Sequence, residues 1–266
     1  IIIEKDKITS KVNGKSFEFG RLELSTLKTL KEKSKINLYN KELTVKEIVG
    51  NVQEFHCNPQ NKNALFQAAS QFNLLEMINP NINPEKGIDR YENDYTQGPA
   101  CAIACGAGTI YRNYFVPINN QVGQSWNNQI NCLELIEQDL CNEELNLWKM
   151  KNGYTLFNQQ GILNVDYLIN NLNEKQREKL KEKLKIGLQW ETEVTISKSK
   201  QLVSQAYCSA LPVAYSNLKP IYWENFARLI LEATYEATLH AALINYEKTN
   251  SNKVFLTSCW WGSFWE

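Results

Sequence analysis

The chain has 266 residues and equal numbers of basic and acidic side chains, 29 of each. A chain of this length is ordinary for one α/β domain with a substantial core. Because the formal net charge is zero, the sequence lacks the overall field that recruits nucleic acid or an anionic membrane. The charge balance therefore points to neither a nucleic acid nor a membrane as the partner.

The N-terminal residues and the cysteines both predict a cytoplasmic protein. Residues 1–7 lack the basic start and extended apolar stretch of a signal peptide. The longest weakly polar stretch, residues 99–111, is shorter than the roughly 20 residues that cross a bilayer. The cysteines are odd in number, seven, and lack paired metal-ligand spacing. We therefore expect reduced thiols, no metal and no cofactor.

Residues 1–50 are predicted to form an N-terminal flank that packs on the core. A strand is expected around residues 17–19, followed by a helix over residues 25–33. A second, short helix is expected where Thr44 and Glu47 have the spacing of a capping box.

Residues 51–266 are predicted to form the main domain, in which strands and helices alternate. Residues 79–97 hold two Asn-Pro dipeptides, a glycine and four acidic residues, which indicates a long functional loop. This order predicts an α/β fold with three layers, a mixed sheet covered by helices on both faces, and a ligand outside the carboxyl ends of the strands. The other predicted elements are strands at 52–55 and 64–68, helices over 98–115 and 126–140, a hairpin of 147–150 and 154–157 around Asn152-Gly153, helices over 165–172 and 174–184, strands at 186–194 and 202–207, a helix over 222–246 and a strand at 253–257.

Three segments at strand or helix ends carry groups suited to a small ligand. The first segment supplies amides and a carboxylate for directional hydrogen bonds. The second segment offers the backbone N–H groups of a helix start for phosphate. The third segment is a potential anion-binding turn. The alternative to ligand binding is composition bias for the first segment, plain helix capping for the second and packing of the tryptophans for the third. The candidate binding residues are Gln67, Asn73 and Glu76 in the first segment, Gln97 and Gly98 in the second, and Gly262, Ser263 and Phe264 in the third.

The order of several short motifs resembles macro domains, with the poly(ADP-ribose) glycohydrolase-like branch as the nearest analogy. The motifs are Gln67-Ala68-Ala69-Ser70, Thr96-Gln97-Gly98-Pro99 before a helix ending Thr109-Ile110-Tyr111-Arg112, a strand at 203–209, and Val254-Phe255-Leu256-Thr257 before a glycine loop with a phenylalanine. The resemblance implies a three-layer macro-domain-like fold and an ADP-ribose pocket. It places Gln67 and Asn73 near the distal ribose or adenosine, and residues 262–264 along the pyrophosphate.

The sequence also departs from this family. Gln97 is followed by Gly98 and Pro99, whereas glycohydrolases have paired glutamates that protonate the leaving group. Two tryptophans stand where a triple-glycine loop is expected, and the chain ends without the family's last helix and strand. We therefore expect binding of ADP-ribose or a related nucleotide without glycohydrolase activity, by a domain that is truncated or whose site has decayed. Glu76, Glu92 and Asp94 are alternative acids, although loop carboxylates are usually solvated.

Two other functions remain open from the sequence. A thiol enzyme would use Cys101, with a pKa lowered by the helix N-terminus and an oxyanion hole formed by Gln97-Gly98. His240 is a poor partner for it, because it falls on an apolar helical stripe and is expected to be a core histidine. A structural or docking subunit would bind protein partners through an aromatic C-terminus, which comprises Trp260, Trp261, Phe264 and Trp265.

Overall fold

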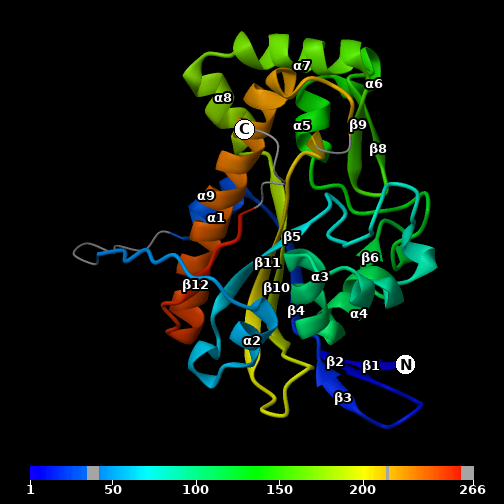
Figure 1. The fold of residues 1–266 in the computed structure, drawn as a ribbon, viewed down its shortest axis with the longest axis vertical. Helices are drawn as coiled ribbons and strands as arrows, with labels where there is room; N and C mark the ends of the chain where they lie inside the picture. Colours follow the sequence, from blue (N-terminus) through cyan, green and yellow to red (C-terminus); the bar gives the residue numbers. More distant parts are fainter. Residues whose placement is uncertain (35–41, 214–215, 259–266) are drawn as a thin grey trace.

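The centre of the molecule is a five-stranded mixed sheet with the order β12-β5-β11-β10-β4 (Figure 1). The computed structural model describes residues 1–34, 42–213 and 216–258. β5 runs parallel to both of its neighbours, and β10 runs antiparallel to both of its own. The predicted α/β class with a mixed sheet is therefore confirmed. The strands are β4 (Arg21–Thr26), β5 (Leu65–Ser70), β10 (Lys185–Glu193), β11 (Leu202–Ser209) and β12 (Val254–Phe255).

Helices cover both faces of this sheet, as the side chains of β11 show. Ser204 donates a hydrogen bond to Asn245 of α9 (Glu224–Thr249) at 2.9 Å. The next residue, Gln205, donates to the backbone carbonyl of Cys101 in α3 (Gln97–Ala104) at 2.9 Å. Because successive side chains of a strand point to opposite faces, α9 and α3 lie on opposite sides of the sheet. α2 (Val52–Cys57) and α4 (Gly106–Tyr114) accompany α3.

The remaining elements extend these layers. Asn152 and Gly153 have left-handed φ angles of 48° and 80°, so the predicted Asn-Gly hairpin is confirmed. Beside α9 lie α1 (Leu27–Lys33), α7 (Gln159–Asn170) and α8 (Glu174–Lys181). The others are β1 (Ile2–Glu4), β2 (Lys7–Thr9), β3 (Ser16–Glu18), η1 (Pro59–Asn61), η2 (Pro84–Lys86), η3 (Asp89–Asn93), β6 (Pro117–Ile118), β7 (Gln121–Val122), α5 (Glu134–Asp139), α6 (Asn142–Leu145), β8 (Trp148–Lys151), β9 (Tyr154–Phe157) and η5 (Pro220–Trp223).

The strand predicted at residues 52–55 is wrong, since these residues belong to helix α2. The side chain of Asn51 caps the helix by accepting a hydrogen bond from the Gln53 N–H. Val52, Phe55 and His56 have helical spacing and pack together against the core. A short apolar run fits a strand or a helix equally well, and here packing favours the helix.

Three predicted helices differ from the observed ones. Residues 42–50 are exposed and form no helix at Thr44, because a short helix needs an apolar face to bury. The helix predicted over 98–115 is divided at Cys105 into α3 and α4. There the Gly106 N–H donates a hydrogen bond to the hydroxyl of Thr195. Of the residues predicted to form a helix over 126–140, only those of α5 (Glu134–Asp139) are helical.

The N-terminal flank contributes directly to the main sheet. β4 pairs with β10 and forms one edge, and α1 packs against α9. The helix predicted from residue 25 begins at Leu27, where the Thr26 hydroxyl accepts from the Thr29 N–H. In the described part of the chain, none of the helices has the length and apolarity to cross a membrane.

The buried histidine is His56 and not His240. His56 is fully buried and stacked on Phe66, and its pKa falls to about 4 because burial disfavours the charged ring. Its Nδ1 bonds to the Val52 carbonyl, so Nε2 is left to accept from the amide of Gln205. His240 is half-buried and bonds to the Ser34 hydroxyl.

We expect His56 to make the fold less stable in acid. Between its ordinary pKa of about 6.5 and its folded value of about 4, the unfolded chain binds a proton that the folded chain excludes. Stability is therefore lost as pH falls through this window, by about 3 kcal/mol from this group. Urea unfolding across the window should show that His56→Gln loses less stability than the unsubstituted protein. Parallel losses in the two proteins would contradict a buried neutral imidazole.

Candidate functional site

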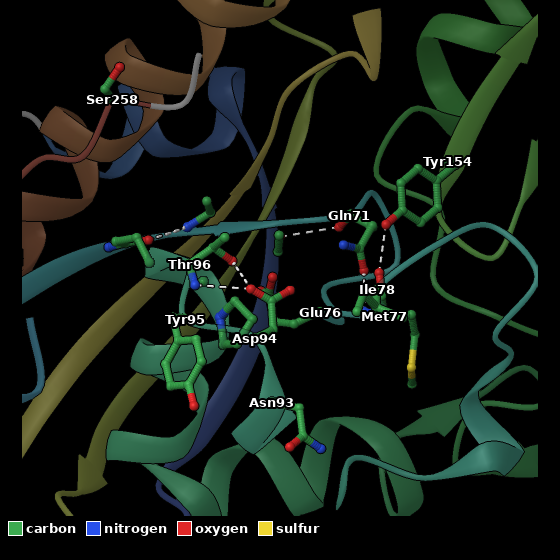
Figure 2. A pocket seen from close by; sticks show the side chains of 15 residues that line it. Gln71, Glu76, Met77, Ile78, Asn93, Asp94, Tyr95, Thr96, Tyr154 and Ser258 are labelled. Atoms are coloured by element: carbon green, nitrogen blue, oxygen red, sulfur yellow. Dashed lines mark hydrogen bonds between the residues drawn. The ribbon is translucent and has the colours of Figure 1, made fainter. Parts of the chain in front are cut away.

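A cavity of about 530 Å³ opens where β5 ends and α3 begins. Figure 2 shows Glu76, Asp94 and Thr96 on one side of it, with Gln71, Met77 and Tyr154 across from them. Its position outside the carboxyl end of a parallel strand is the one expected for a ligand site in an α/β protein. The lining residues are Ala69, Ser70, Gln71, Glu76, Met77, Ile78, Asn93, Asp94, Tyr95, Thr96, Gln97, Gly98, Pro99, Tyr154 and Ser258.

The side chain of Gln97 fixes the start of α3 against β5. β12 pairs with β5 only at Leu65 and Phe66, so the backbone beyond that point needs another partner on this side. The Gln97 amide accepts from the Ala69 N–H at 2.9 Å and donates to the Gln67 carbonyl at 2.8 Å. It thus bonds to β5 as the peptide group of a neighbouring strand would.

Gly98 lets α3 approach β5 closely enough to form the cavity wall. A Cβ atom at this position would collide with the backbone carbonyl oxygen of Ala69 and with the carboxyl group of Glu76. Because a backbone oxygen cannot move aside cheaply, only glycine fits here. The same close contact brings the Glu76 carboxyl against the first turn of α3.

Glu76 is a buried acidic side chain of the lining. It is 5% exposed, and its Oε1 atom has no hydrogen-bond partner among the described residues. Burial raises the pKa of this carboxyl well above its ordinary value, Arg112 opposes the rise and Asp94 adds to it. The backbone N–H of Glu76 donates to the Tyr91 hydroxyl at 2.8 Å, which holds the residue in place. The cavity therefore contains a buried carboxyl group whose neutral form is favoured by burial and whose side chain makes no hydrogen bond with the described residues.

Arg112 places a buried positive charge behind Glu76. Its guanidinium stacks on the Tyr207 ring, 3.5 Å from the centroid, and donates to the Leu74 carbonyl and the Thr109 hydroxyl. Among the described residues no carboxylate lies within ion-pair distance of it, and its Nη1 atom is unpartnered. This charge favours the ionised form of Glu76.

Asp94 forms the second acidic group of the cavity. Its Oδ1 atom accepts from the Thr96 N–H at 2.9 Å and from the Thr96 hydroxyl at 2.6 Å. The described lining contains no lysine, arginine or histidine. Tyr95, 96% exposed, stands at the rim. Across the described residues, no cluster of three or more histidine, cysteine or acidic side chains could hold a metal ion.

The structure brings together three of the predicted binding residues, Glu76, Gln97 and Gly98. Gln67 and Asn73 lie outside the cavity. The Gln67 amide donates to the Thr238 hydroxyl of α9 and accepts from the Thr257 N–H, and the Asn73 amide bonds to Gln129 and to the Leu75 N–H. Gly262, Ser263 and Phe264, like the aromatic C-terminus, lie outside the described residues.

The environment of Cys101 opposes the lowered pKa expected for a nucleophilic thiol. Cys101 is fully buried in α3, outside the cavity lining, and burial raises its pKa well above the ordinary value. Its sulfur accepts a hydrogen bond from the Gln97 amide at 3.2 Å. Glu92, one of the alternative acids, is exposed and does not line the cavity.

Several lining residues were not predicted from the sequence. Gln71 holds the loop after β5 by accepting from the Met77 N–H at 2.8 Å. Tyr154 comes from the distant β9 strand and donates to the Met77 carbonyl at 2.5 Å. The Asn-Gly turn correctly predicted the hairpin that carries Tyr154, but no local signal indicated that the hairpin reaches this cavity.

Replacing Gln97 by an apolar side chain of similar shape should destabilise the fold. Gln97→Met leaves the Ala69 N–H and the Gln67 carbonyl without partners, which costs about 1–3 kcal/mol. The exposed Gln160→Met variant is the matched control and should stay within about 0.5 kcal/mol of the unsubstituted protein. Urea unfolding of the three proteins checks this, and equal stabilities would show that the Gln97 bonds contribute nothing.

Glu76 should make stability depend on pH in the opposite direction to His56. Its folded pKa is raised, so stability is lost as pH rises from the ordinary carboxyl value through the raised one. Glu76→Gln cannot ionise and avoids this loss. The variant's stability relative to the unsubstituted protein, measured by urea unfolding, should therefore increase as pH rises above the ordinary carboxyl value. A difference that stays constant with pH would mean that Glu76 is not buried as a neutral acid.

Comparison with protein-family models, with curated proteins and with solved structures found no match to the chain. The cavity is therefore interpreted from its own residues. Its main features are a glycine contact, an amide that completes a strand edge, two acidic side chains and a lining without basic groups.

Proposed function

We propose that the cavity binds the ribosyl part of ADP-ribose or of a related nucleotide, in a macro-domain-like fold. The observation that carries this proposal is the unpartnered carboxyl of Glu76 at the carboxyl end of a parallel strand. An acidic side chain near such a strand end is a common partner of ribose hydroxyls in nucleotide-binding α/β folds. The mixed sheet, with helices on both faces, supports the macro-like arrangement.

The two carboxyl groups of the lining offer acceptor atoms to a ligand that donates. The donors of Thr96 and Tyr154, and the amide of Gln97, are already bonded within the protein. Asp94 Oδ2 and Glu76 Oε2 are acceptor atoms without partners among the described residues, whereas Glu76 Oε1 is sealed from solvent. Sugar hydroxyl groups are donors of the required kind.

The charge of the lining favours a ribose, and not the pyrophosphate, beside the start of α3. Gln97 and Gly98 were candidates for phosphate binding through their backbone N–H groups. A phosphate at that point would face the Asp94 carboxyl group, with no basic side chain in the described lining to balance its charge. The pyrophosphate is therefore assigned outside this part of the cavity, and the role of residues 262–264 stays a prediction.

The volume of the cavity is compatible with this assignment. A space of about 530 Å³ falls within the range of small-molecule sites, which is about 300–1,000 Å³. The exposed ring of Tyr95 lies at the rim, where an aromatic base can stack on it. The function proposed is binding, and the two carboxyl groups act as hydrogen-bonding partners of the sugar.

Removing the Asp94 carboxylate should weaken ADP-ribose binding. Isothermal titration of Asp94→Ala should show an affinity about ten- to a hundredfold lower, because a hydrogen bond to a charged group contributes about 1.5–3 kcal/mol. Glu92→Ala is the matched control, since Glu92 lies in the same loop but is exposed and outside the lining. It should bind ADP-ribose as the unsubstituted protein does.

Thermal unfolding of both variants separates lost binding from lost folding. Absence of heat with millimolar ADP-ribose and the unsubstituted protein would contradict the proposed function, as would equal affinities of Asp94→Ala and Glu92→Ala.

A further inference from the structure

The Glu76 carboxyl is in a chemical state that does not match the ligand proposed for it. A neutral carboxylic acid has an O–H donor, whereas ribose hydroxyl groups bond best to a carboxylate with its several acceptor positions. Oε1 of Glu76 is sealed from solvent without a partner, and Oε2, the carboxyl oxygen at the cavity, accepts no hydrogen bond from the described residues. A ligand that donates to this oxygen favours loss of the carboxyl proton.

The groups packed around Glu76 permit this ionisation once a ligand supplies donors. The Arg112 guanidinium of α4 lies behind the carboxyl, without an ion-pair partner among the described residues, and stabilises a negative charge. Asp94, on the loop before α3, opposes the charge. The other titratable groups facing this region are uncharged near neutral pH, because burial raises the pKa of each. They are Tyr91 of η3, Cys101 of α3 and Tyr207 of β11.

We propose that binding of the sugar is coupled to release of one proton from Glu76. In the free protein the carboxyl keeps its proton. When ribose hydroxyl groups donate to the carboxyl oxygens, the O–H bond of Glu76 breaks, the electron pair stays on the carboxylate and the proton passes to the solvent. The site therefore binds its ligand more tightly as pH rises. This inference rests on the proposed function, since it concerns the same cavity and ligand.

Isothermal titration with ADP-ribose in two buffers of different ionisation enthalpy measures the released proton. About one proton should appear in the buffer per ligand bound near neutral pH. The affinity should rise with pH, by up to about tenfold per pH unit, and level off above the pKa of free Glu76. The adenine and the pyrophosphate of ADP-ribose keep their charge over this range, so the change reports on the protein.

Two variants assign the proton to a residue. Glu76→Gln should bind without proton release and with a pH-independent affinity. Glu137→Gln is the matched control, because Glu137 is another partly buried carboxyl with a pKa raised by burial, but it bonds to Trp148 and Asn131 outside the cavity. It should keep the full proton release.

The ¹³C resonance of the Glu76 carboxyl gives a readout that does not depend on binding by the variant. Its assignment comes from the one signal that Glu76→Gln lacks. In the unsubstituted protein it should move from the position of a neutral acid to that of a carboxylate when ADP-ribose is added at about pH 7. ADP-ribose binding with no proton release and no movement of this resonance would overturn the coupling and leave the proposed function standing. No binding at any pH would overturn both.

Discussion

The backbone of β5 beyond the end of β12 must find hydrogen-bond partners, and the candidate site depends on how it does so. Buried peptide groups without partners are costly, and β12 reaches only the first two residues of β5. Gln97 supplies the missing donor and acceptor from its side chain. This one amide determines where α3 begins relative to the sheet.

The other features of the cavity follow from that attachment. Once α3 starts beside β5, the residue after Gln97 must be glycine, because any side chain there would meet a backbone oxygen. The close contact buries the Glu76 carboxyl, and burial raises its pKa. Arg112 then lies behind an acid whose neutral form is favoured by burial and whose ionised form is favoured by the Arg112 charge. A local backbone requirement is thus connected to the site at which we propose ligand-linked release of a proton.

The sequence predicted the general architecture better than the directions of its side chains. The Asn152-Gly153 turn and the strands at the centre of the sheet have strong local signals, and the structure confirms them. Glu76, Gln97 and Gly98 were found because they stand at the ends of predicted elements. Gln67 and Asn73 satisfied the same pattern, but their amides are used inside the fold, and a strand's pattern does not tell which amide faces a ligand. The position of the Arg112 guanidinium behind the site also depends on tertiary packing.

A crystal structure of the protein with ADP-ribose tests the central claim most directly. The account requires a ribose inside the cavity, with its hydroxyl groups within hydrogen-bond distance of Glu76 and Asp94, and with both phosphates away from the two carboxyl groups. A ligand bound elsewhere, or one that places a phosphate against Glu76, would contradict it.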